Sequence, residues 1–366
     1  MNGRKRVGSG PHAKRLAAMA VVCVALLGLL TLLGLLSPQT WLADRAADLR
    51  VQTALALGLL AVALGATRHL RIAAGTTGLA LVNLLLLWPL LSPGLRPLAP
   101  AWWPPALLPR MATMPQGVPA TLGPQLALRV MSTNVWYRNR DYAAVRAAVR
   151  AASPDIAVFL EVTPRWAQEL AVLRDLWPYQ RWVPGRGHDA VMVISRLPWR
   201  EAKPVVLGGA GEADAVRVTV MPGGYPLDIL GVHLRWPVTP VTAAARERAL
   251  VSLTRLARSS VHPLILLGDL NLTPHDGQFA RLLAAGRLRN CAASAGLVTT
   301  WPAWAMLAGQ QVPGLQLDHC LYTRGLTVEQ FALGPQVGSD HRPILATLLV
   351  PALRHGLAPD HSTFQP

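Results

Sequence analysis

Three long apolar stretches near the N-terminus limit what this chain can fold into. They run from Leu16 to Leu36, from Val51 to Thr67 and from Ile72 to Leu91, and none contains a charged residue. A helix needs about 20 apolar residues to cross a bilayer, with about 17 as the lower limit. The apolar core of a signal peptide is shorter, about 7–15 residues. The stretches therefore predict a membrane anchor in residues 1–92 with three transmembrane helices (16–36, 51–67 and 72–91).

Basic residues beside the apolar stretches predict the orientation of this anchor. Arg4, Lys5, Arg6, Lys14 and Arg15 precede the first stretch, and the short loop 68–71 before the third is also basic. Positively charged flanks stay in the cytoplasm. Three spans then place everything after Leu91 on the outer face, which predicts a multi-pass protein of the cell membrane with an extracytoplasmic domain. The orientation reverses if the second stretch does not span.

The basic composition is only weak evidence for a nucleic-acid partner. The net charge of +16 would suit a nucleic-acid partner. However, almost all of the basic residues are Arg, and Arg, Ala, Leu, Pro and Gly are abundant together, a pattern typical of a GC-rich genome. We attribute the charge to this bias. Cys23, Cys291 and Cys320 have no metal-ligand spacing, and a Cys291–Cys320 disulfide is left open, with two small core residues as the favoured interpretation.

The remaining chain predicts a linker, a folded domain and a tail. Residues 93–125 contain nine prolines, which exclude regular structure and indicate an extended linker. Residues 354–366 are expected to form a flexible tail. Between them, in 126–353, short apolar runs alternate with helical patterns. Strands are expected at 127–132, 155–160, 190–194, 215–220, 227–232, 263–267, 316–322 and 344–349, and helices at 142–152, 164–176, 242–259 and 278–285. This alternation predicts a layered α/β domain, for which two face-to-face sheets with helices outside would fit.

Polar residues gather at the ends of the expected strands, where a rigid scaffold commonly presents functional groups. They are Asn134, Glu161, His233, Asp269, Asn271, Asp318, Asp340 and His341. Taken singly, each has an ordinary interpretation as a turn residue, a helix cap or a core histidine. Their order and type together are far more specific.

That order resembles the endonuclease/exonuclease/phosphatase (DNase I-like) superfamily. The motifs are Asn134-Val135, Pro154-Asp155-Ile156 with Leu160-Glu161, Ser195-Arg196-Leu197-Pro198, Gly231-Val232-His233-Leu234, Gly268-Asp269-Leu270-Asn271, Leu317-Asp318-His319 and Ser339-Asp340-His341-Arg342-Pro343-Ile344. The resemblance covers residues 126–353 and implies a DNase I-like four-layer α/β sandwich. It also implies a magnesium-dependent hydrolase acting on phosphate ester bonds. With its three spans and Asn139 shortly after Asn134, the chain also looks like the VanJ/YafD-type membrane members.

The resemblance implies a hard, oxygen-ligated divalent metal, Mg²⁺ or Mn²⁺. Glu161 is expected to be its main ligand, with Asn134 beside it and Asp340 completing the metal or water network. Trp136 departs from the abasic-site endonucleases, which have an aspartate there that helps to bind metal. That departure argues against close kinship with those enzymes.

The reacting groups follow from the same resemblance. Asp269 would align or deprotonate the attacking water, and Asn271 would donate hydrogen bonds to the phosphoryl oxygens. His341 would contact the scissile phosphate as an imidazolium, oriented by the carboxylate of Asp318.

A second histidine is expected beside the phosphate. His233 would be a second phosphate contact or the leaving-group acid, with Asp189 as its acidic partner. Arg235 and Trp236 follow it directly and are expected to bind substrate, although a structural role is equally open.

These residues predict an enzyme that hydrolyses a phosphodiester, phosphomonoester or pyrophosphate at the outer face of the membrane, with a lipid-linked phosphate as one candidate substrate. The expected partners are the lipid bilayer and the phosphate-ester substrate, lipid-linked or nucleic acid, with no obligate protein partner. An extracellular nuclease is the alternative within the same chemistry. A non-catalytic, membrane-tethered binding protein is the alternative of another class.

Overall fold

The computed structural model describes residues 11–91, 125–185, 188–208, 214–307 and 310–352. The chain divides into two compact units. One comprises Met1–Leu91 together with His275–Gln278, and the other comprises the rest. The predicted tail and, apart from Gln125, the predicted linker lie outside the described residues.

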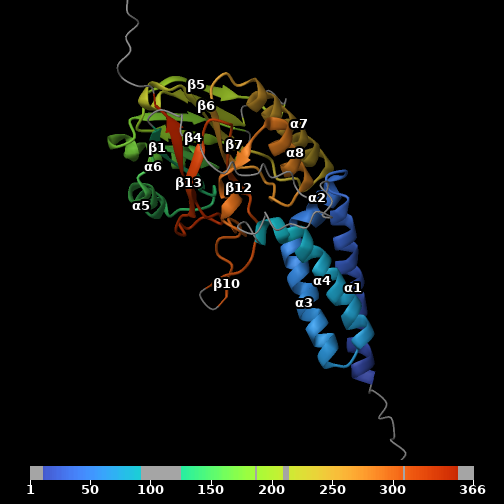
Figure 1. The fold of residues 1–366 in the computed structure, drawn as a ribbon. Coiled ribbons are helices and arrows are strands. Elements are labelled where there is room, and N and C mark those ends of the chain that lie inside the picture. The colour runs from blue at the N-terminus through green and yellow to red at the C-terminus, as the bar shows by residue number, and fades with distance from the viewer. Residues whose placement is uncertain (1–10, 92–124, 186–187, 209–213, 308–309, 353–366) are drawn as a thin grey trace, which may run out of the picture. The chain divides into compact units, whose positions relative to one another are not determined.

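Helices make up the described part of the N-terminal segment (Figure 1). They are α1 (Pro11–Leu35), α2 (Trp41–Asp48), α3 (Arg50–Ala66) and α4 (Leu70–Leu91). The Thr40 hydroxyl caps α2 by accepting from the Ala43 N–H. Between α1 and α4, the Asn83 amide donates to Thr31 Oγ1 over 2.9 Å, the kind of polar contact that holds apolar helices together in lipid.

Two of these helices, Ala17–Leu35 and Leu70–Leu91, are long and apolar enough to cross a membrane. The predicted second span, 51–67, corresponds to α3, which reaches a membrane-spanning length only together with α2, from which it is bent by 57°. Within the described residues the structure thus supports two candidate spans, and three only if the bent pair counts as one.

The second unit is built on two six-stranded sheets. The first has the order β13 (Thr327–Leu333), β14 (Ile344–Pro351), β1 (Gln125–Asn134), β2 (Ile156–Leu160), β4 (Val191–Ser195), β3 (Tyr179–Val183). The second has the order β5 (Trp199–Val205), β6 (Ala215–Val220), β7 (Leu227–His233), β8 (Leu264–Asp269), β12 (Asp318–Tyr322), β9 (Arg289–Asn290). Neighbours are antiparallel except for two parallel pairs, β1 with β2 and β7 with β8.

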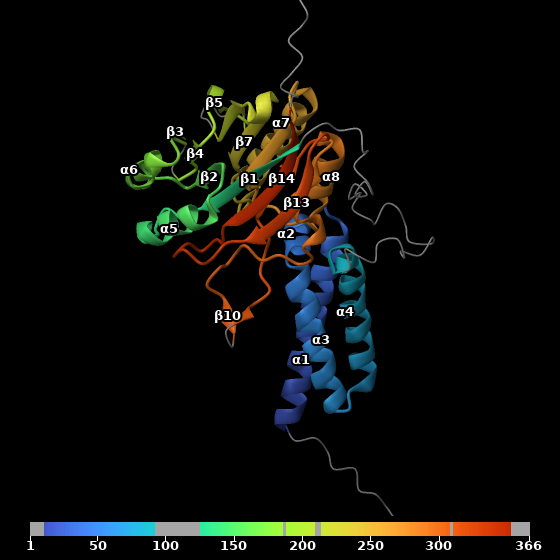
Figure 2. The ribbon, with the colours of Figure 1, turned by 60° about the vertical axis from the view of Figure 1, so that its left-hand side comes forward.

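Apolar side chains of both sheets form one core between them, including Ile156 and Val158 from the first sheet and Ile229 and Ile265 from the second. Helices cover the outer faces (Figure 2). Helices α5 (Tyr142–Ala152) and α6 (Pro164–Ala171) pack on the first sheet, and α7 (Pro240–Ser259) and α8 (Gly277–Gly286) pack on the second. This confirms the expected four-layer α/β sandwich.

Glycines let the backbone approach closely where the two parallel strands of the second sheet end. A Cβ on Gly231 would lie 2.8 Å from Val158 Cγ1 of the facing sheet. Gly268 has a φ of +147°, and a Cβ there would lie 1.9 Å from the Val232 carbonyl oxygen. Only glycine fits this position. The next residue, Asp269, is thereby held opposite His233 in the register of β7 and β8.

The structure contains a disulfide bond between Cys291 and Cys320, so the interpretation favoured from the sequence, two unbonded small core residues, is wrong. Cys291, in the 3₁₀ turn Cys291–Ser294, is bonded to Cys320 of β12, and their Cα atoms are 5.3 Å apart. Cys23 is free and exposed.

Candidate active site

The predicted site residues converge at one end of the sandwich because of how the strands run. Asn134 ends β1, and Glu161 follows β2, its parallel neighbour. His233 and Asp269 end β7 and β8, which are also parallel. The carboxyl ends of parallel strands meet at one edge of a sheet, so each sheet brings two functional groups to this end. Asp318 begins β12 and pairs antiparallel with Asp269.

An asparagine connects the carboxylates of the two sheets. Asn134 Nδ2 lies 3.0 Å from Glu161 Oε1 and 3.3 Å from Asp269 Oδ2. The second oxygen of Glu161 accepts from the Tyr137 N–H over 3.1 Å. Asn134 and Glu161, predicted together as metal ligands, are therefore in direct contact.

Two site residues, one after β8 and one after β2, are held in an uncommon backbone conformation. Asn271 has a φ of +48° and Glu161 a φ of +58°, both in the left-handed region that side-chain-bearing residues seldom adopt. Such residues concentrate at functional sites, where the surrounding contacts hold them. Asn271 donates its backbone N–H to Asp269 Oδ1 over 2.8 Å and one side-chain N–H to the Leu234 carbonyl over 2.8 Å. Its second side-chain N–H is the one that the predicted phosphoryl contact would use.

His341 and Asp318 form a buried ion pair. Nδ1 of His341 lies 2.8 Å from Asp318 Oδ2, and its Nε2 lies 3.7 Å from Asp269 Oδ2. Burial alone would lower the pKa of His341, but the charge and hydrogen bond of Asp318 outweigh it and raise the pKa to about 10. Burial likewise opposes ionisation of Asp318, but the His341 cation and the hydrogen bond to it leave the pKa of Asp318 below its usual value. The imidazole is therefore held as a cation at neutral pH.

Asp269 is in the opposite electrostatic situation. Burial raises its pKa to about 6, the neighbouring Asp318 charge adds to the rise, and the two histidines oppose it. A general base works best when its pKa is near the operating pH, because it is then both deprotonated and basic enough to accept a proton. Asp269 has the properties of such a base.

His233 lies between the acids without a short hydrogen bond to any of them. Its Nε2 is 4.0 Å from Glu161 Oε1 and 4.0 Å from Asp269 Oδ2, and its Nδ1 is 3.9 Å from Asp189 Oδ1. Asp189 is closer to Arg235, at 2.9 Å. The structure thus brings Asp189 and Arg235 to the edge of the site.

Trp236, the other predicted substrate contact, is 58 % exposed and is not part of the buried set. Asp340 is beside that set. Its Oδ2 accepts from Trp301 Nε1 over 3.3 Å, and burial, together with the charge of Glu161, raises its pKa.

The donor atoms fit a hard divalent cation. Asp269, Asp318 and His341 offer ligand atoms within 4.8 Å of one another. That group is a poor metal site, because His341 stays protonated and its Nδ1 is hydrogen-bonded to Asp318. Glu161, Asn134 and Asp340 are the better set, because all three offer oxygen ligands. Oδ1 of Asp340 is buried and has no hydrogen-bond partner among the described residues.

The sequence did not reveal several residues that hold the site together. The Ser339 hydroxyl donates to the Asn134 carbonyl over 2.7 Å and accepts from the His341 N–H over 3.0 Å. The buried Arg246 of α7 donates to the Asn271 carbonyl. Ser339 stood within a recognised motif, which was a signal, whereas nothing distinguished Arg246 from the many other arginines.

An aromatic pair was missed as well. The Tyr137 and His188 rings stack with centroids 3.6 Å apart, and Arg138 lies over the Tyr137 ring. The two aromatic residues come from loops far apart in sequence, so no local pattern pointed to the pair.

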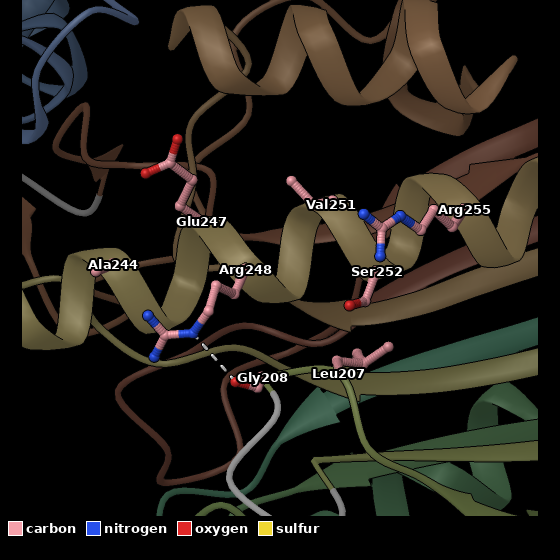
Figure 3. Close-up of a pocket in the computed structure, with 8 residues that line it drawn as sticks. All are labelled: Leu207, Gly208, Ala244, Glu247, Arg248, Val251, Ser252 and Arg255. Atoms are coloured by element: carbon pink, nitrogen blue, oxygen red, sulfur yellow. Dashed lines mark hydrogen bonds between the residues drawn. The ribbon is translucent and has the colours of Figure 1, made fainter.

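A separate hollow of about 460 Å³ lies along α7 (Figure 3). Its lining comprises Leu207, Gly208, Ala244, Glu247, Arg248, Val251, Ser252 and Arg255. Arg248 is tied to the Gly208 carbonyl over 3.3 Å, and the lining includes no histidine and a single carboxylate. It lacks the acid–base groups found at the strand ends.

Residues 131–341 match the model of the Endonuclease/Exonuclease/phosphatase family. The match covers more than half of the chain, and the chain therefore belongs to this family, whose members are phosphoesterase hydrolases.

Solved structures show the same fold. The 3′ phosphatase NExo from Neisseria, bound to a product DNA hairpin, has a TM-score of 0.51 and 19 % identity, over 60 % of this chain and 98 % of that one. D. rerio TDP2, complexed with a single-strand DNA product, has a TM-score of 0.50 and 17 % identity, over 61 % and 98 % of the two chains. Both likenesses concern the fold alone. A search of curated proteins gave no match.

Proposed function

We propose that this chain is a membrane-anchored, metal-dependent phosphoesterase of the VanJ/YafD type that hydrolyses a lipid-linked phosphate ester or pyrophosphate at the outer face of the membrane. One observation supports hydrolysis as the reaction. A buried carboxylate with a pKa near neutrality, Asp269, faces a histidine held as a cation, His341, across 3.7 Å. Base and cation therefore lie side by side, so that both can reach an attacking water and a phosphoryl group bound next to them.

The proposed mechanism assigns one step to each group. Asp269 accepts a proton from the attacking water, while the His341 imidazolium and the free side-chain N–H of Asn271 stabilise the charge on the phosphoryl oxygens. In this mechanism His233 protonates the leaving group. A divalent ion held by Glu161, Asn134 and Asp340 would supply further charge neutralisation when bound.

Two observations support the outer face. The basic N-terminal flank and three spans, with α2 and α3 counted as the second, direct the domain outside. The Cys291–Cys320 bond agrees, because disulfides persist in oxidising compartments and are rare in the cytosol.

The test is hydrolysis by the full chain reconstituted in lipid nanodiscs. The substrates are a polyprenyl pyrophosphate, a phospholipid, bis-p-nitrophenyl phosphate and plasmid DNA, each with Mg²⁺, Mn²⁺ or EDTA. The Asp269→Asn variant is compared with Glu201→Gln, an exposed acid paired with Lys203 away from the site. We expect metal-dependent turnover of a lipid-borne phosphate, lost in Asp269→Asn and retained in Glu201→Gln.

The other outcomes are equally informative. Cleavage of plasmid DNA alone, declining with salt as phosphate-backbone contacts predict, would make the protein a nuclease. A folded protein that binds metal and turns over none of the substrates would support the non-catalytic binding protein.

A further inference from the structure

The β10–β11 hairpin carries apolar side chains that no other part of the domain covers among the described residues. Strands β10 (Met306–Leu307) and β11 (Gln310–Gln311) project from the domain in both ribbon views (Figures 1 and 2). Trp304 is 69 % exposed, Met306 49 %, Leu307 73 % and Val312 39 %. We call these four residues the hairpin patch. Exposed apolar side chains grouped in one short segment in this way indicate contact with a membrane or a protein.

The surrounding sequence is uncharged. From Cys291 to Leu317 the chain contains no Asp, Glu, Lys or Arg, although it is rich in arginine elsewhere. A nucleic-acid contact would need basic residues to neutralise phosphates. The lipid interface, by contrast, favours tryptophan and aliphatic side chains without charge.

The hairpin is fixed to the active site at its base. The backbones of Trp301 and Leu315 exchange hydrogen bonds of 2.9 and 2.7 Å. The indole of Trp301 donates to the Asp340 carboxylate, and the Ala303 N–H donates to the Asp340 carbonyl over 2.7 Å. Arg342 donates to Gln311 Oε1 over 2.9 Å. The position of the patch is therefore set by the same segment that carries His341.

A bilayer is within reach of this patch. The same chain contains two helices long and apolar enough to cross a membrane. Residues 92–124 separate α4 from β1, and a chain of that length spans on the order of 100 Å when fully extended. A tether of that length keeps the domain within on the order of 100 Å of a membrane that these helices cross, whereas no feature of the patch selects a particular soluble protein.

We propose that the hairpin patch inserts into the bilayer surface and holds the active site against phosphates carried by lipids. The insertion rests on the hairpin patch and on the two candidate membrane helices, and the lipid-borne substrate rests on the proposed function.

The first experiment measures insertion without using catalysis. In a full-length Cys23→Ala background, which keeps the disulfide, Leu307→Cys is labelled with an environment-sensitive fluorophore in nanodiscs. The matched control is Val261→Cys, an apolar residue that is 90 % exposed and follows α7. We expect blue-shifted emission at position 307, quenched by spin-labelled lipids and shielded from iodide. The control should show the reverse. Equal iodide quenching at both positions, or a response at 307 to plasmid DNA and not to lipid, would overturn the proposal.

The second experiment links insertion to turnover. The double variant Trp304→Asp and Leu307→Asp should raise the KM for a lipid phosphate in nanodiscs about tenfold, since burying such side chains contributes at least that factor. Its kcat/KM for water-soluble bis-p-nitrophenyl phosphate should stay unchanged, and Val261→Asp should alter neither. An unchanged KM for the lipid phosphate would overturn the substrate part. Lipid quenching at 307 in a protein without phosphoesterase activity would remove the proposed function and leave the insertion standing.

Discussion

Asp228 and Asp269 lie on adjacent parallel strands, and both are essentially inaccessible to solvent. Asp228, near the start of β7, accepts from Thr219 Oγ1 over 2.6 Å and from Ser260 Oγ over 3.2 Å, and pairs with Arg217. Burial opposes its ionisation, but these partners outweigh burial and lower its pKa. Asp269, at the end of β8, has no arginine or hydroxyl partner among the described residues, and burial raises its pKa.

The difference separates a carboxylate whose charge is compensated by its neighbours from the one that we propose as the general base. Asp228 is surrounded by donors and a cation, as buried charges in stable proteins are. Asp269 is left under-satisfied beside the charge of Asp318, so it is ready to take up a proton. A poorly compensated carboxylate at the end of β8 is what the proposed general base requires.

Replacing Asp269 should give the largest effect. Asp269→Asn removes the proposed base, so kcat/KM should fall by about 10²–10⁴-fold. Its raised pKa means that the ionised form costs stability above the pKa of an unfolded aspartate, so the melting temperature should stay level or rise. Steady-state kinetics and thermal unfolding at pH 7.5 measure both. Activity within a few-fold of the parent would contradict the role.

Replacing Asp228 should give the opposite pattern. Asp228→Asn leaves Arg217 without its anion and should lower the free energy of unfolding by about 3 kcal/mol. The kcat of the folded protein should not change, because Asp228 lies at the other end of the strand. Urea unfolding and kinetics on the same sample test this. A loss of kcat without a loss of stability would break the comparison.

The ion pair of Asp318 and His341 should impose a pH dependence. A raised histidine pKa stabilises the fold fully below the unfolded value, about 6.5, and this contribution is lost as pH rises through about 10. Asp318→Asn should remove that dependence between pH 6.5 and 10. It should also lower kcat/KM about tenfold to 100-fold at pH 8.5, with a smaller loss at pH 6, where His341 can still be protonated. The measurement is the pH profile of stability and of kcat/KM for the parent and for Asp318→Asn. Profiles of the same shape in both proteins would show that Asp318 has no such role.

Asp189 should matter least, because it is partly exposed and shares its charge with Arg235. Asp189→Asn should lower kcat/KM about tenfold by weakening the orientation of His233. Arg235→Gln is the matched comparison, since it frees Asp189 to approach His233. If Arg235→Gln alone impairs turnover, the arginine rather than Asp189 serves the substrate.

The predictable part of the fold is the part with a strong apolar pattern. The expected helix 142–152 coincides with α5, and the fully buried strands β2, β4, β7 and β8 were all expected. Among the missed strands, β3, β5 and β13 lie at sheet edges, and Val183 is the only buried residue in the three. Such strands lack a continuous apolar run. They form because they pair with a neighbouring strand, and a local sequence pattern does not show that pairing.

The same distinction applies to the site. Asp269, His341 and Glu161 stood at the ends of strongly apolar strands or in recognised motifs, so their convergence could be anticipated. Trp301 and Arg246 reach the site from a loop and a helix, and only the tertiary packing places them there. Local sequence contains no information about such contacts.

The Ser339–Asn134 hydrogen bond joins residues 205 positions apart in the chain. A ribosome adds about 5–20 residues per second, so on the order of 10–40 s separates the synthesis of these two residues. In the last third of that interval the growing polypeptide contains Glu161 and Asp269 without His341. Any chain released before Ser339 has no assembled site at all. The order of synthesis thus leaves incomplete copies of this chain without the histidine that the proposed reaction needs.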